Sequence, residues 1–123
     1  MKYLLLLLSI PFLAASECGQ QKDKIAETKT TADSLPACIR KVIDQAEKSP
    51  SPDSPVEINE YVYNNKTVYL FTAPCCDQFN VLYDTACNVI CAPSGGFTGK
   101  GDGKCPDFDK NAKLVKQIWK SKQ

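Results

Sequence analysis

The chain has 123 residues, of which 43% are hydrophobic and 24% are charged, and its formal net charge is +1. This length fits one small domain, and the balanced charge argues against a protein that binds nucleic acid through an excess of Lys and Arg. The chain contains seven cysteines and no histidine. Catalysis by a histidine base and zinc sites with histidine ligands are therefore excluded. We expect no nucleic-acid partner and no cofactor.

The N-terminus has the pattern of a signal peptide. Lys2 supplies a positive charge, and a mostly leucine run extends from Leu4 to Ala15. This run is too short to cross a membrane, which requires roughly 20 apolar residues in a helix. We therefore assign residues 1–17 to a signal peptide and predict that the protein is exported.

Cys18 follows this run directly and suggests lipidation. Seven cysteines are six plus one, and an exported protein seldom keeps an odd terminal thiol. We expect Cys18 to become the lipid-bearing first residue of a bacterial lipoprotein, in the periplasm or at the outer membrane, with the bacterial membrane as its partner. Glu17 departs from the small residue usual at that position. Cleavage after the stretch Ala14–Ser16, which would release a soluble secreted protein, therefore remains the alternative.

The rest of the chain divides into a tether and one domain. Residues 18–33 are polar and rich in Lys, Gln and Thr, so they cannot bury enough surface to offset the entropy of ordering. They are predicted to form a disordered tether. Residues 34–123 are predicted to form a single disulfide-rich domain.

A helix opens this domain, and two hairpins follow it. Asp33 or Ser34 can cap the helix, Pro36 suits its first turn, and apolar residues recur at spacings of three and four through Ala46. Residues 56–63 and 66–72 are rich in β-branched and aromatic side chains and flank Asn64-Asn65, which suits a tight hairpin turn. A second hairpin is expected from residues 81–83 and 89–91.

The C-terminal segment is predicted to be an amphipathic helix from about Asp107. Phe108, Ala112, Val115 and Ile118 or Trp119 would form its apolar face. The opposite face would carry a row of lysines: Lys110, Lys113, Lys116 and Lys120. This row is interpreted as a solvated face rather than a surface for anionic lipid. The predicted fold class is thus α+β, with a small antiparallel sheet flanked by an N-terminal and a C-terminal helix.

Six cysteines remain after Cys18 is set aside, and they predict three disulfides. They are Cys38, Cys75, Cys76, Cys87, Cys91 and Cys105. A bond between adjacent cysteines distorts the peptide between them, so the three connectivities that contain it are set aside. Twelve connectivities remain of the 15 that six cysteines allow. We expect Cys75 and Cys76 to point to alternate sides of an extended segment, with one of them bonded to Cys38.

Several short motifs of the chain resemble those of a known family. The motifs that resemble this family are Cys38-Ile39, the predicted strand Val68–Phe71, the cysteine pair, Asp84–Asn88, Gly95–Gly99 and the segment Ala112–Trp119. Together they resemble a bacterial family of short exported proteins, catalogued as a domain of unknown function, over residues 38–120. Many members carry lipoprotein-type signal peptides. The resemblance thus implies a location in the cell envelope and no activity.

Two further groups of residues have the composition of a chemical site. Cys75-Cys76 has the residues of a redox pair or soft-metal site but lacks Cys-x-x-Cys spacing, so structural disulfides are preferred. Asp102, Asp107 and Asp109 are weak candidates for a calcium site, although their spacing does not match an EF-hand loop. The preferred interpretation is a turn followed by acids that offset a helix dipole.

We therefore expect a non-enzymatic, disulfide-stabilised module that binds an unknown protein or small-molecule ligand. Surface aromatics among Tyr61, Tyr63, Tyr69 and Phe97 are the contact candidates. The alternative is a calcium-dependent or cysteine-based redox factor in the bacterial envelope. No catalytic residue and no metal ligand is assigned.

Overall fold

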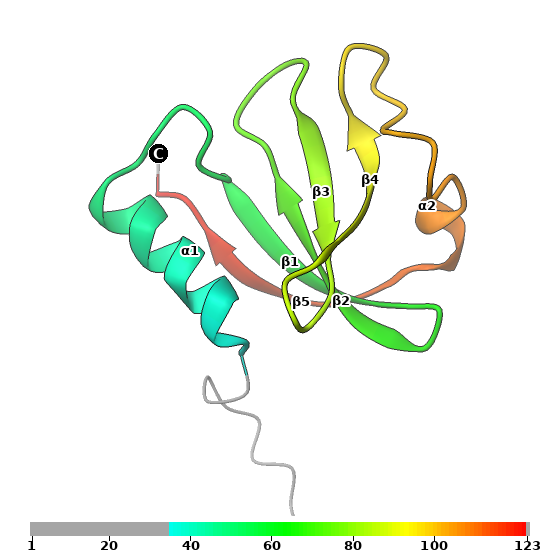
Figure 1. Cartoon of the computed structure of the whole chain (residues 1–123), viewed down its shortest axis with the longest axis horizontal. Helices are drawn as coiled ribbons and strands as arrows, with labels where there is room; N and C mark the ends of the chain where they lie inside the picture. The colour runs from blue at the N-terminus through cyan, green and yellow to red at the C-terminus, as the bar shows by residue number, and fades with distance from the viewer. Residues whose placement is uncertain (1–34, 123) are drawn as a thin grey trace, which may run out of the picture. The chain divides into compact units, whose positions relative to one another are not determined.

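The computed structural model describes residues 35–122 (Figure 1). The predicted signal peptide, Cys18 and the tether lie outside the described residues. The elements are, in chain order, α1 (Ala37–Lys48), β1 (Glu57–Tyr63), β2 (Lys66–Thr72), β3 (Phe79–Tyr83), β4 (Val89–Gly95), α2 (Phe108–Asn111) and β5 (Lys113–Lys120). This arrangement confirms the α+β fold class. Between residues 35 and 122, no helix combines the length and the apolar character that a membrane span requires.

The five strands form one sheet in the order β4-β3-β2-β1-β5, and neighbouring strands are antiparallel. Both predicted hairpins are confirmed as β1–β2 and β3–β4. The first turns through Asn64 and Asn65 at φ 50° and 59°, a left-handed conformation that asparagine tolerates better than most residues. Since β5 pairs with β1, the last strand and β4 form the two edges of the sheet.

The predicted C-terminal helix is wrong beyond its first turn, because α2 ends at Asn111 and Lys113–Lys120 is a strand. The register of β5 against β1 explains the misleading spacing. It pairs Leu114, Gln117 and Lys120 with β1 but passes over Val115 and Ile118, which sit at two irregularities of the β-bulge kind. Each bulge adds one residue, so side chains on the same face recur every three residues instead of every two. A twice-bulged strand therefore imitates the period of a helix.

Each face of the sheet carries its own core. Neighbouring residues of a strand point to opposite faces, and Val68 and Tyr69 of β2 mark the two sides. Tyr69 packs with Ile58 and with Ile39 of α1, so the predicted apolar stripe of α1 is confirmed as its buried side. Val68 belongs to a second cluster, which contains Tyr63, Leu82, Cys91, Cys105 and Phe108. The helices α1 and α2 therefore cover different faces.

Candidate functional site

All six cysteines of the described domain are bonded in pairs. The structure pairs Cys38 with Cys87, Cys75 with Cys76, and Cys91 with Cys105. The first bond joins α1 to the β3–β4 loop over a sequence separation of 49 residues. The third joins β4 to the segment before α2 over 14 residues, and both its cysteines are buried, at 1% and 5% exposed. These two bonds fasten separate parts of the fold.

The bond between Cys75 and Cys76 corrects the predicted connectivity, because the two residues do not lie on an extended segment. The strand β2 ends at Thr72, and a turn follows in which the Gln78 amide donates to the Cys75 carbonyl at 3.2 Å. Cys76 adopts a φ of 60°. The partner of Cys38 is therefore Cys87, and the adjacent pair forms a small ring of its own.

This ring belongs to a surface that we name the rim, formed by residues 73–79 and residues 95–99. The two segments are the β2–β3 loop with the first residue of β3, and the last residue of β4 with the start of the loop that follows. In Figure 1 both loops stand at the same end of the sheet. They are joined directly, since the Gly96 amide donates to the Gln78 carbonyl at 2.9 Å.

Polar side chains hold the base of the rim in place. The Asn80 carboxamide accepts a hydrogen bond from the Ala73 amide at 2.8 Å and donates one to the Ser94 hydroxyl at 3.0 Å. The Gln78 carboxamide donates to the Asp53 carboxylate at 3.2 Å. Asn80 of β3 thus ties the residue that follows β2 to Ser94 of β4. The exposed residues of the rim are carried on an anchored base.

Two aromatic rings define the outer surface of the rim. Phe97 is 96% exposed and Phe79 is 48% exposed. Gly96 has a φ of 71°, and a Cβ atom at this position would overlap the Phe79 ring, so the ring lies against bare backbone. Cys75 and Cys76 are also exposed. The rim therefore presents two phenyl rings and a disulfide to solvent.

Only one of the four predicted contact aromatics occupies such a position. Tyr63 and Tyr69 are buried in the two cores, and Tyr61 packs edge-on against Phe108 at 5.2 Å between ring centres. Phe97 alone among the four is exposed. Sequence reasoning missed Phe79; the available signal was the Gly95-Gly96 pair, because glycine at a strand end often marks the close approach of another group.

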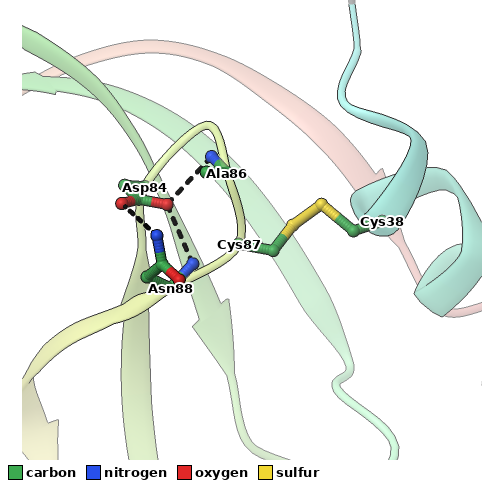
Figure 2. The surroundings of a disulfide bond; sticks show 5 residues. All are labelled: Cys38, Asp84, Ala86, Cys87 and Asn88. Atoms are coloured by element: carbon green, nitrogen blue, oxygen red, sulfur yellow. Dashed lines mark hydrogen bonds between the residues drawn. A yellow bond between two sulfur atoms is a disulfide. The ribbon is translucent and has the colours of Figure 1, made fainter.

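The β3–β4 loop at the other end of β3 is organised by Asp84 (Figure 2). One carboxylate oxygen accepts the amides of Ala86 and Asn88 at 2.9 and 2.8 Å, and the other accepts the Asn88 side chain at 3.0 Å. The hydrogen bonds from Asn88 lower the pKa of Asp84, because they favour the ionised form. Its carboxylate thus shapes the loop that presents Cys87 to Cys38.

The weak calcium candidates Asp102, Asp107 and Asp109 do not converge. Asp102 accepts the Lys104 amide at 3.0 Å and forms an ion pair with the Lys104 side chain at 3.7 Å. Asp107 accepts the Tyr63 hydroxyl at 2.7 Å, which is the main cause of its lowered pKa. Within residues 35–122, no three acidic or cysteine side chains are close enough to hold a metal ion. Asp102 therefore stabilises its own loop, whereas Asp107 links the start of α2 to Tyr63 of β1.

The lysine row is also divided, because its residues lie on a strand rather than a helix. Lys116 pairs with Glu60 at 3.7 Å and Lys120 with Glu57 at 3.4 Å. Glu57 and Glu60 are three apart on β1, so the two ion pairs lie on opposite faces of the sheet. The interaction with Lys120 helps to lower the pKa of Glu57, after the hydrogen bond from Asn59. No single basic face results from these residues.

Two of the surface pockets among residues 35–122 lie away from the rim. One, of about 430 Å³, is lined by Ala46, Pro50 and Trp119, whose indole N–H donates to Glu47 at 2.9 Å. The other, of about 590 Å³, is lined by Tyr63, Lys66, Asp84 and Ile90, among others. The carboxylates in both are already hydrogen-bonded within the fold. Sequence patterns gave no sign of either pocket.

Comparison with models of protein families identifies the family of this domain. Residues 44–121 match the family model described as Domain of unknown function (DUF6970), which covers more than half of the chain. No curated protein and no solved structure matches the chain. The match confirms the resemblance to a family of unknown function over nearly the same residues. The chain belongs to the DUF6970 family.

Proposed function

We propose that this DUF6970 protein is an exported, lipid-anchored protein of the bacterial cell envelope that acts as a non-enzymatic binding module. The observation that carries the proposal is the complete pairing of the six domain cysteines. Disulfides form and persist in oxidising compartments, and they are rare where thioredoxin and glutathione keep thiols reduced. A small domain stabilised by such bonds is suited to an oxidising compartment outside the cytoplasm.

The anchor rests on the seventh cysteine. Cys18 follows the leucine-rich run and precedes the polar residues 19–33, which at about 5–6 Å times the square root of their number would hold the domain some 20 Å from the membrane. Lipidation makes use of this cysteine and leaves an even set for the domain. The resemblance to exported bacterial lipoproteins supports the same location.

A binding role fits the chemistry of the described residues better than catalysis. The chain has no histidine, and the carboxylates of Asp84 and Asp107 are held ionised by hydrogen bonds. A general acid would need a raised pKa instead. Exposed aromatic residues are characteristic of contact surfaces, because they bury a large area with few freely rotating bonds. We therefore assign the contact with a protein or small-molecule ligand to the rim.

Mass spectrometry of the chain purified from bacterial membranes tests the anchor. The expected mass begins at Cys18 and includes attached acyl chains, and Cys18→Ser should move the protein out of the membrane fraction. A mature mass that begins at Glu17 and lacks acyl chains would contradict the lipid anchor.

Crosslinking in intact cells tests the binding role. A photoreactive amino acid at Phe97 is expected to give a discrete adduct. The matched control places it at Leu114, which is 60% exposed on β5 at the other edge of the sheet. Equal labelling from both positions would contradict a contact site at the rim.

A further inference from the structure

We propose that the Cys75–Cys76 bond is a thiol-exchange site, which accepts two electrons from a dithiol reductant, whereas the other two disulfides are structural. This proposal stands apart from the binding function and does not require it. It assigns thiol–disulfide exchange to one of three disulfide bonds that the sequence alone does not distinguish. The assignment rests on exposure, loop length and the anchoring of the surrounding chain.

Exposure separates the three bonds first. Cys91 and Cys105 are buried, and Cys38 and Cys87 are half-buried between α1 and the β3–β4 loop. Both members of the adjacent pair are exposed. An exchange reaction requires an incoming thiolate to reach one of the two sulfurs, so access favours this bond. Exposed disulfides are also the more labile class.

The length of chain that each bond closes separates them again. A disulfide stabilises the fold mainly by restricting the unfolded chain, and this effect grows with the number of residues in the closed loop. The sequence separations are 49 for Cys38–Cys87, 14 for Cys91–Cys105 and one for Cys75–Cys76. The adjacent pair constrains almost no chain. Its presence is therefore poorly explained by stability.

The surrounding structure permits the bond to open without unfolding. Asn80 holds the chain at Ala73 on one side of the ring, and the Gln78 carbonyl accepts the Gly96 amide on the other. Both anchors are independent of the two sulfurs. Cys76 has a φ of 60°, a conformation that non-glycine residues rarely adopt, and opening the ring removes one constraint that keeps it there. The change is thus confined to the rim.

The reaction balances with a dithiol as the other reactant. A thiolate of the reductant attacks one sulfur of the pair, the Cys75–Cys76 bond breaks, and the departing sulfur takes a proton from solvent. The second thiolate of the reductant then attacks the mixed disulfide and releases the other cysteine, which is also protonated. The domain gains two electrons and two protons, and the reductant leaves as a disulfide.

The residue that follows the pair is acidic. Asp77 carries a negative charge, and a neighbouring negative charge disfavours a second one on a reduced sulfur. Few thiolates are therefore available on the reduced pair to attack another disulfide. We expect stoichiometric reduction by a dithiol and no catalytic reduction of other proteins' disulfides, such as those of insulin.

Graded reduction with dithiothreitol, followed by alkylation and peptide mapping, tests the proposal. The protein is the full chain carrying Cys18→Ser, so that only the six domain cysteines are counted. Cys75 and Cys76 are expected to be alkylated together at a dithiothreitol concentration at least about tenfold below that required for the other four. The double variant Cys75→Ser/Cys76→Ser should show no alkylation in that window and should melt within about 4 °C of the parent.

Three results would overturn the assignment. The first is simultaneous opening of all three disulfides, and the second is earlier alkylation of Cys91 and Cys105 or of Cys38 and Cys87. The third is alkylation of Cys75 and Cys76 before any reductant is added, because no bond would then exist to exchange.

Discussion

The two ends of β3 use disulfide chemistry in opposite ways. At one end, the disulfide between Cys87 and Cys38 joins the β3–β4 loop to α1 over a sequence separation of 49 residues. The Asp84 carboxylate accepts three hydrogen bonds from Ala86 and Asn88 of the same loop. At the other end, the disulfide of the rim joins only adjacent residues, and the rim also carries the exposed rings of Phe79 and Phe97. The contrast teaches that one end is built to hold the fold together. The other end is built to present groups to solvent.

Removal of the long-range bond should give the largest effect. The double variant Cys38→Ala/Cys87→Ala frees a loop of 49 residues in the unfolded chain, so we expect it to lower the free energy of unfolding by about 4 kcal/mol. Urea unfolding measures this loss. The matched double variant Cys75→Ala/Cys76→Ala should lose far less. If both double variants lost the same free energy of unfolding, the two disulfides would not differ in their contribution to stability, which would contradict the comparison between the two ends of β3.

A backbone substitution probes the packing of the rim. Gly96→Ala places a methyl group against the Phe79 ring at a φ of 71°, and we expect a loss of about 2 kcal/mol. Gly99→Ala is the control, because its φ is 73° but no atom lies within 4 Å of the added Cβ. It should lose about 1 kcal/mol, which reports the backbone conformation alone. Identical losses in urea unfolding would show that the contact with Phe79 contributes nothing.

Acid should weaken the Asp84 end selectively. The pKa of Asp84 is lowered in the folded state, mainly by its hydrogen bonds with Asn88, so the unfolded chain binds a proton more readily as the pH falls. Its contribution is present above the ordinary value of 3.8 and is lost as the pH drops through the lowered pKa.

The variant Asp84→Asn should therefore be less stable than the parent at pH 7, and the difference should shrink toward pH 3. Urea midpoints at the two pH values measure it. Asp44→Asn on α1 removes the same charge without these bonds and serves as the control. A difference for Asp84→Asn that does not change with pH would contradict a structural role for the carboxylate.

Local patterns in the sequence predicted one end of the domain better than the other. The helix α1 and the turn at Asn64-Asn65 follow from apolar spacing and turn preference, which are properties of neighbouring residues. The apolar spacing of β5 predicts a helix, because the bulges at Val115 and Ile118 are apparent only from its pairing with β1. Tertiary pairing decided that segment.

The cysteine connectivity and the rim lay beyond such reasoning for a related reason. The sequence around Cys75-Cys76 predicts an extended segment with bonds to other parts of the chain. The turn that brings the two sulfurs together instead depends on Asn80 and Gly96, which lie outside this segment. Phe97 was among the aromatic candidates, but its exposure is set by where the loop runs. Its three tyrosine companions point into packed surfaces instead. Spacing reveals residue types, whereas the choice among them required the fold.

The smallest change in stability should come from the residue with the largest expected effect on binding. Phe97 is 96% exposed, so Phe97→Ser should change the free energy of unfolding by no more than about 0.5 kcal/mol. If the rim is the contact surface, the same substitution should abolish the crosslinked adduct formed from a photoreactive residue at Phe79. Leu114→Ser removes an exposed apolar side chain from β5 and should leave that adduct intact. An adduct that survives Phe97→Ser would move the binding surface away from this end of the sheet, and the exposed phenyl ring would then need another explanation.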